Sequence, residues 1–246
     1  MFTYQIQVEY LGTNFVGWQI QKNGVSVQET LEKIFSSFLG DKIRIIGSGR
    51  TDAGVHASGQ SAHFKSEHKI LNKNNFLNSI NYFLRKYNIS ILNIKNRPSQ
   101  FHARHSANER IYKYVIINRN SSLVIEKNKA WHIKKKLNLK SMKNGAEILK
   151  GTHNFATFRA SSCQAKSPIR TLKKVKVKKS KCKIIITFQS KSFLQQQVRS
   201  MVGSLKYLGE GKWSFNDFKN AFKSKKRKMC APPAPAHGLY LTKVIY

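Results

Sequence analysis

Residues 2–10 read Phe-Thr-Tyr-Gln-Ile-Gln-Val-Glu-Tyr, with an apolar side chain at every second position. Successive side chains of a strand point to opposite faces of a sheet, so this alternation predicts a half-buried β-strand. Further along, Ser26 and Glu29 have the spacing of a capping box, which predicts that a helix starts there. The chain therefore opens with a strand followed by a helix.

The same reasoning extends the pattern through the first hundred residues. Apolar spacing predicts strands near 43–46, 61–65 and 89–94, and a second helix over 76–84. The resulting order is βαββαβ, the split βαβ unit of ferredoxin-like folds.

The second part of the chain repeats this order. The pattern predicts strands over 110–118, 172–178, 182–188 and 239–246, and helices over 139–149 and 194–208. We therefore predict an α+β protein made of two tandem ferredoxin-like halves, residues 1–105 and 106–246, with antiparallel or mixed sheets.

The chain is strongly basic, with 45 Lys and Arg against 11 Asp and Glu and a formal net charge of +34 among 246 residues. Such a protein binds polyanions, of which nucleic acid is the most common. An A/T-rich genome would also enrich lysine without selection for binding, so part of the charge has two possible origins.

Several classes of protein are disfavoured by composition. No apolar run approaches the roughly 18 residues of a membrane span, and the first ten residues lack the features of an export signal, so we expect a cytoplasmic protein without a membrane partner. The three cysteines, Cys163, Cys182 and Cys230, have wide spacings that predict neither a disulfide framework nor a zinc site.

The stretch Gly49 to Ala57 reads Gly-Arg-Thr-Asp-Ala-Gly-Val-His-Ala and contains the most conspicuous carboxylate of the chain, Asp52. A strand that runs into this glycine-rich segment is expected to place Asp52 on an exposed turn, where Arg50 can keep it ionised. An ionised carboxylate can act as a covalent nucleophile, whereas the structural alternative is a surface Asx-turn. No second carboxylate shares the segment, which argues against a glycosidase pair or a magnesium site.

Two further segments carry candidate binding residues. Tyr112 and Tyr114 alternate on a strand flanked by basic residues, a pattern that suits base stacking but also suits core tyrosines. Arg199 lies beside the apolar stripe of its predicted helix, where a partly buried guanidinium needs an anionic partner. With so few acids available, Asp52 is an attractive partner for Arg199.

Taken in order, these segments resemble the tRNA pseudouridine synthase A family over nearly the whole chain. The matching motifs are residues 10–19, 49–57, 101–104, 110–114, 151–155, 197–203 and 238–241. The chain departs from the family pattern at Gln195 and Gln196, where Tyr-His is common, and at Asn154, where aspartate is common.

The resemblance implies two α/β halves whose sheets join across a central active-site cleft. It implies a homodimer that binds tRNA and converts uridine to pseudouridine at positions 38, 39 and 40 of the anticodon stem-loop, without a cofactor or metal. It makes Asp52 the nucleophile and Arg50 the residue that helps displace the target base. It also assigns stacking on the uracil to Tyr112, pairing with Asp52 to Arg199, and a place in the pocket wall to Leu239.

Two rival hypotheses remain open at this point. The first is a tRNA-binding module without catalytic activity, although such a module has no need of the Asp52 motif. The second is a general basic protein that coats nucleic acid, which predicts similar affinity for duplex DNA and for tRNA at fixed salt.

Overall fold

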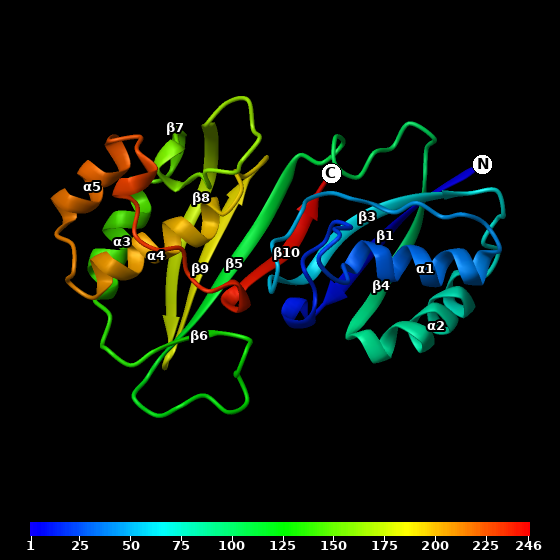
Figure 1. The fold of residues 1–246 in the computed structure, drawn as a ribbon, viewed down its shortest axis with the longest axis horizontal. Coiled ribbons are helices and arrows are strands. Elements are labelled where there is room, and N and C mark those ends of the chain that lie inside the picture. The colour runs from blue at the N-terminus through cyan, green and yellow to red at the C-terminus, as the bar shows by residue number, and fades with distance from the viewer. The chain divides into compact units, whose positions relative to one another are not determined.

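The computed structural model describes residues 1–246 as ten β-strands and five α-helices joined by loops and short 3-10 turns (Figure 1). The chain forms two compact units, Met1–Asn108 with Tyr240–Tyr246, and Glu109–Leu239. The last strand, which we predicted within the second half, is therefore counted with the first unit. None of the helices has the length and hydrophobicity needed to cross a membrane.

The first unit has the predicted βαββαβ order. Its elements are β1 (Phe2–Tyr10), α1 (Val27–Leu39), β2 (Ile46–Gly47), β3 (His56–Ser66), α2 (Lys73–Leu84) and β4 (Ile89–Arg97). The strands lie in the order β4-β1-β3-β2 and are all antiparallel, as in ferredoxin-like folds. The final strand β10 (Leu239–Ile245) runs parallel to the start of β3, with Tyr240 opposite His56.

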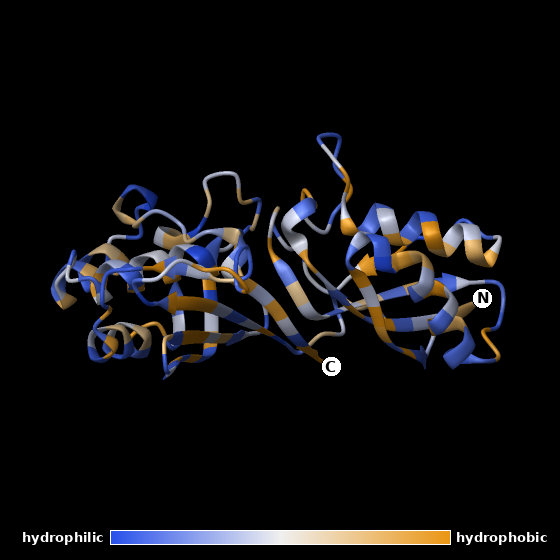
Figure 2. Ribbon diagram, turned by 90° about the horizontal axis from the view of Figure 1, so that it is seen from below, coloured by the Kyte–Doolittle hydropathy of each residue, from blue (hydrophilic) through white to orange (hydrophobic).

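Local sequence signals account for most of these elements. The capping box at α1 is confirmed, because Ser26 Oγ accepts from the Glu29 N–H at 3.1 Å and Glu29 accepts from the Ser26 N–H at 3.5 Å. Apolar and polar residues alternate along the strands (Figure 2). The side chains on the inner face form an aromatic core with the helices, in which Phe35 packs edge-on against Phe64 and Phe76.

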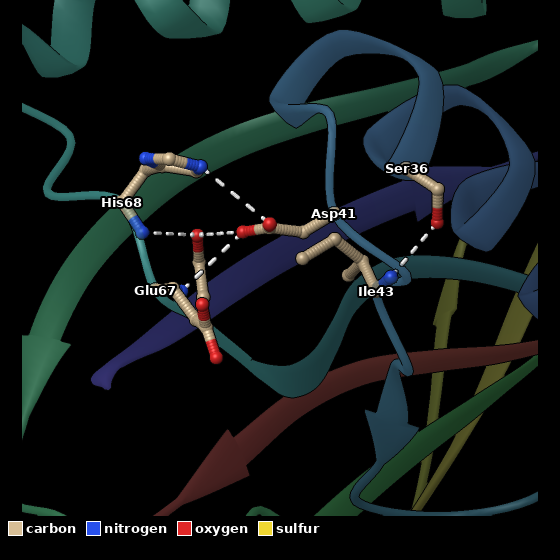
Figure 3. Close-up of polar contacts among 6 residues, drawn as sticks. Ser36, Asp41, Ile43, Glu67 and His68 are labelled. Carbon is tan, nitrogen blue, oxygen red and sulfur yellow. Dashed lines mark hydrogen bonds and ion pairs between the residues drawn. The ribbon is translucent and has the colours of Figure 1, made fainter.

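The strand predicted at 43–46 is wrong in its extent, because only Ile46 and Gly47 pair with β3. The Ile43 N–H donates to Ser36 Oγ at 2.9 Å (Figure 3), and the Ile45 N–H donates to a Glu32 carboxylate oxygen at 2.9 Å. These backbone groups are thus bonded to side chains of α1 and not to a neighbouring strand.

The connection between α1 and β2 is also bonded to the residues that follow β3. The Asp41 carboxylate accepts from the Glu67 N–H at 3.4 Å and lies 3.5 Å from His68 Nε2 (Figure 3). These contacts fix the route by which the chain approaches the Gly49–Ala57 segment.

The second unit is built on an antiparallel sheet in the order β5-β9-β8-β7, with the short strand β6 parallel to β5. Its elements are β5 (Glu109–Asn118), β6 (Trp131–Ile133), α3 (Leu139–Glu147), β7 (Gly151–Asn154), β8 (Ile169–Ser180), β9 (Lys183–Ser190), α4 (Gln197–Gly209) and α5 (Phe215–Lys223). The predicted strands and helices of this part are confirmed. Strands β6 and β7 were not predicted, because three or four residues are too few to show a period.

The segment that follows β1 is bonded to the Gly49–Ala57 loop along its backbone. The Trp18 N–H donates to the Thr51 carbonyl at 3.1 Å, and the Gly54 N–H donates to the Phe15 carbonyl at 3.3 Å. We call this set of contacts the loop clamp. It holds the loop by main-chain bonds, which do not depend on flexible side chains.

Glycine is required where the two segments meet. Gly17 has φ of +119°, and a Cβ added to it would lie 2.6 Å from the Thr51 carbonyl oxygen. A Cβ on Gly12 would lie 2.0 Å from the Val55 carbonyl oxygen. Any side chain at either position would therefore push the two segments apart.

We predict that Gly17→Ala destabilises the protein more than Gly40→Ala, a control that also has a positive φ, +74°, but has open space around it. The control should lower the free energy of unfolding by about 1 kcal/mol through backbone strain alone. Gly17→Ala should cost roughly 2–4 kcal/mol in urea unfolding, because it adds a collision with the Thr51 carbonyl. Equal losses for the two variants would show that the close approach is unimportant.

A buried histidine supports the first unit from within β3. His63 is 4% exposed, its Nδ1 accepts from the Ala103 N–H at 3.1 Å, and its ring lies 4.9 Å from that of His102. Burial and the neighbouring His102 lower the pKa of His63 to about 4. The fold therefore selects the neutral form of this ring.

The lowered pKa predicts a loss of stability on acidification. The unfolded chain takes up a proton on this residue near pH 6.5, so the stabilisation is complete above that pH and is lost as pH falls toward 4. Between pH 7 and pH 5, urea unfolding of the unmodified protein should lose about 1–2 kcal/mol more than that of His63→Gln. Parallel pH profiles for the two proteins would contradict this assignment.

Candidate active site

Asp52 lies in the loop between β2 and β3 and forms an isolated antiparallel bridge with Gly17. The Val55 N–H donates to the Asp52 carbonyl at 3.1 Å, which closes a tight turn with Gly54 at φ of +75°. The turn includes the exposed Ala53, as expected, but Asp52 itself is half-buried.

Two buried side chains anchor the backbone on either side of Asp52. Thr51 Oγ1 lies 2.8 Å from the Tyr10 hydroxyl, and His56 Nδ1 accepts from the Gly12 N–H at 2.9 Å. The partners are 41 and 44 residues apart in the sequence, so no local spacing reveals them. These contacts fix the backbone of the loop on both sides of Asp52.

Gln60 was also missed as a positioning residue. It is fully buried in β3, and its amide accepts from Ser48 Oγ at 2.9 Å and donates to the Gly49 carbonyl at 2.7 Å. The sequence contained a signal only in part, because Gln60 alternates with the apolar Ala62 and Phe64 on one face of β3. A polar residue at such a position needs a hydrogen-bond partner.

Arg50, two residues before Asp52, is exposed. It forms no hydrogen bond or ion pair, so the proposed local contact with Asp52 is not present in this structure. Its five N–H donors are therefore available to a bound ligand.

In the second unit, Tyr112 lies on β5 opposite Phe188 of β9 and is 7% exposed. Its ring meets the ring of Phe193 edge to face, at 5.2 Å between centroids and 85° between planes. Tyr114, two residues along the strand, is fully buried and donates to the Pro235 carbonyl at 2.8 Å. Burial raises the pKa of Tyr114 far above its ordinary value, so this tyrosine is a neutral core residue.

Arg199 lies in the first turn of α4 and is half-buried, as the sequence suggested. Its Nε donates to the Ala234 carbonyl at 2.8 Å, and its own carbonyl accepts from the Ala234 N–H at 3.0 Å. The helix comes close to this segment because Gly203 lacks a side chain; a Cβ there would lie 2.0 Å from the Pro232 carbonyl oxygen. The Pro-rich segment thus fixes the Arg199 side chain from one side.

The positive charge of Arg199 affects the pKa of the neighbouring His237. Burial lowers the pKa of His237, and the nearby Arg199 lowers it further. Leu239, just after that histidine, is 5% exposed and begins β10. Arg199 therefore lies close to two titratable side chains of the second unit, His237 and Tyr114, whose pKa values it lowers.

The five predicted site residues are thus divided between the two units, with Asp52 and Arg50 in the first and Tyr112, Arg199 and Leu239 in the second. Across the 246 residues, no three His, Cys, Asp or Glu side chains are arranged to hold a metal ion. The first unit supplies a carboxylate and a guanidinium group, and the second supplies a guanidinium group, an aromatic ring and an apolar side chain.

Comparison with known proteins matches these features. The sequence profile described as "tRNA pseudouridine synthase" matches residues 6–106 and 146–246. The chain is 58% identical over 246 residues to the tRNA pseudouridine synthase A of Pelagibacter ubique (strain HTCC1062), covering 100% of both chains. The enzymes of the same name from Xanthobacter autotrophicus and Parvibaculum lavamentivorans are 44% and 42% identical, over 99% of this chain and 99% and 98% of theirs. The chain therefore belongs to the tRNA pseudouridine synthase family.

Proposed function

We propose that this protein modifies uridines 38, 39 and 40 of the tRNA anticodon stem-loop, with Asp52 as the nucleophile. As a member of its family it is an isomerase that converts uridine to pseudouridine in tRNA. The observation that carries the residue assignment is the loop clamp, which fixes the backbone around one carboxylate through contacts from distant parts of the chain.

The reaction defines what the site must do. The C1′–N1 bond of uridine breaks, a C1′–C5 bond forms, C5 loses a proton and N1 gains one. Substrate and product are isomers, so the balance calls for no redox partner. Asp52 attacks either C1′ or C6 of the ring; both routes use the same carboxylate as a covalent nucleophile.

The remaining residues receive roles that follow from their chemistry. The base must leave its stack to be reached, and Arg50 takes part in displacing it. Tyr112 stacks on the uracil, and its hydroxyl accepts the C5 proton at the end of the reaction. Arg199 pairs with the Asp52 carboxylate, and Leu239 contributes an apolar wall.

The proposal also includes a homodimer that works in the cytoplasm. A basic chain of net charge +34 is suited to the tRNA polyanion. Sedimentation at enzyme concentrations that support turnover tests the dimer directly.

We predict that Asp52→Asn abolishes turnover and leaves tRNA affinity within a few-fold of the unmodified protein. The substitution keeps the shape of the side chain and the backbone contacts of the loop, but removes the nucleophile. Release of tritium from tRNA labelled at C5 of uridine measures turnover, and filter binding measures affinity. Retained activity in Asp52→Asn would refute the assignment.

The same assays separate the two rival functions. Folded protein that binds tRNA but releases no tritium would favour a silent binding module. Equal affinity for duplex DNA and tRNA, falling together with rising salt, would favour a general coat protein.

A further inference from the structure

A basic groove runs between α3 and β8 in the second unit. It has a volume of about 640 Å³. Strand β7 pairs only with residues 169–172 of β8, so the rest of this edge of the sheet is unpaired and open to the groove. The lining includes seven lysines and a single carboxylate, that of Glu147.

Most of these lysines have no counter-charge. Glu147 pairs with Lys150 at 2.6 Å, and Lys173 pairs with Glu109. The five others form no ion pair: Lys143, Lys174, Lys176, Lys178 and Lys179. Gathering unpaired cations in one groove raises the local positive potential and favours an anionic ligand.

The lysines of β8 are regularly spaced. Lys174, Lys176 and Lys178 are exposed and alternate with the buried Val175 and Val177. Residues two apart along an antiparallel strand are about 6.8 Å apart, so these ammonium groups form a row suited to successive phosphates of a nucleic-acid strand.

The row lies apart from the uridine-binding residues of this unit. Val175 pairs with Phe188, and Phe188 pairs with Tyr112, so these three share one face of the sheet. The lysines between them point to the opposite face. The groove follows the free edge of β8, which lies two strands away from β5 in the sheet, so it is not an extension of the Tyr112 site.

A simpler explanation must be considered, because lysines on an edge strand also prevent pairing with other edges. That explanation covers β8 but gives no reason for Lys143 of α3, which lines the same groove and forms no ion pair. An acidic peptide added to the edge would need pockets for its side chains, and the exposed lining is almost entirely lysine.

We propose that the α3–β8 groove is a second tRNA-binding surface, which holds the phosphate backbone of the substrate away from the reacting uridine. The inference rests on the proposed tRNA function but concerns binding alone. The groove increases the affinity for tRNA and the salt dependence of binding, and it contributes no group to the isomerisation itself.

The test replaces Lys174, Lys176 and Lys178 by Gln in the full-length protein. The matched control replaces Lys219, Lys223 and Lys226, three exposed lysines at and just after α5, by Gln. Filter binding of tRNA across a salt series should show the log–log slope of the groove variant reduced by about 2, at roughly 0.7 per lost phosphate contact. The control should keep its slope, and the groove variant should keep its kcat at saturating tRNA while its KM rises.

Several outcomes would overturn the proposal. Equal slope changes in both variants would show a general charge effect. An unchanged slope with self-association of the groove variant in gel filtration would show that the lysines only protect the edge. Loss of polyglutamate binding in the groove variant, with tRNA binding unaffected, would assign the groove to an acidic peptide.

A second measurement needs no substitution in the groove. Reductive methylation followed by mass spectrometry reports the accessibility of each lysine with and without tRNA. Lys174, Lys176 and Lys178 should be protected by tRNA, and Lys219 and Lys223 should not. The same protection should be seen with Asp52→Asn, because this variant keeps the groove. If Asp52 were not the nucleophile, the protection of the groove lysines would be unchanged. If the groove did not bind tRNA, the protection would be absent.

Discussion

The main-chain hydrogen bonds between residues 15–18 and 51–54 are the constraint that sets the position of the Gly49–Ala57 loop in the first unit. They require two segments from distant parts of the sequence to approach within van der Waals contact, and Gly12 and Gly17 are what permit it. Buried contacts from Tyr10 and His56 then fix the residues next to Asp52. In the proposed reaction, a carboxylate on such a fixed backbone would lose little conformational freedom when it meets the uridine, which would lower the entropic cost.

In the second unit, a similar close approach of two backbone segments holds a cation, Arg199. Helix α4 comes within contact of the Pro-rich segment at Gly203, and the Ala234 backbone makes two hydrogen bonds with Arg199. The buried Tyr114 and the half-buried His237 lie near Arg199, and burial favours the neutral form of both. Each unit therefore holds one proposed functional group beside a close approach of two backbone segments, Asp52 in the first unit and Arg199 in the second.

Much of this fold could be predicted because local periodicity decides it. The alternation in residues 2–10 and the capping box at Ser26 specify their elements without reference to the rest of the chain. The prediction of a strand at 43–46 was wrong in its extent because the side chains of Ser36 and Glu32 accept hydrogen bonds from its backbone N–H groups. This is a tertiary effect that the spacing of apolar residues does not reveal. The family motifs identified Asp52 and Arg199, whereas the roles of Tyr10, His56 and Gln60 became visible only when partners far apart in sequence were seen together.

The central claim is that the carboxylate held by the loop clamp isomerises uridines of the anticodon stem-loop. Mapping pseudouridine in tRNA transcripts after incubation with the pure protein tests it most directly. The account predicts new pseudouridine at one or more of positions 38, 39 and 40, and none when Asp52→Asn replaces the unmodified protein. Pseudouridine confined to other positions of the tRNA, or formed equally by Asp52→Asn, would contradict it.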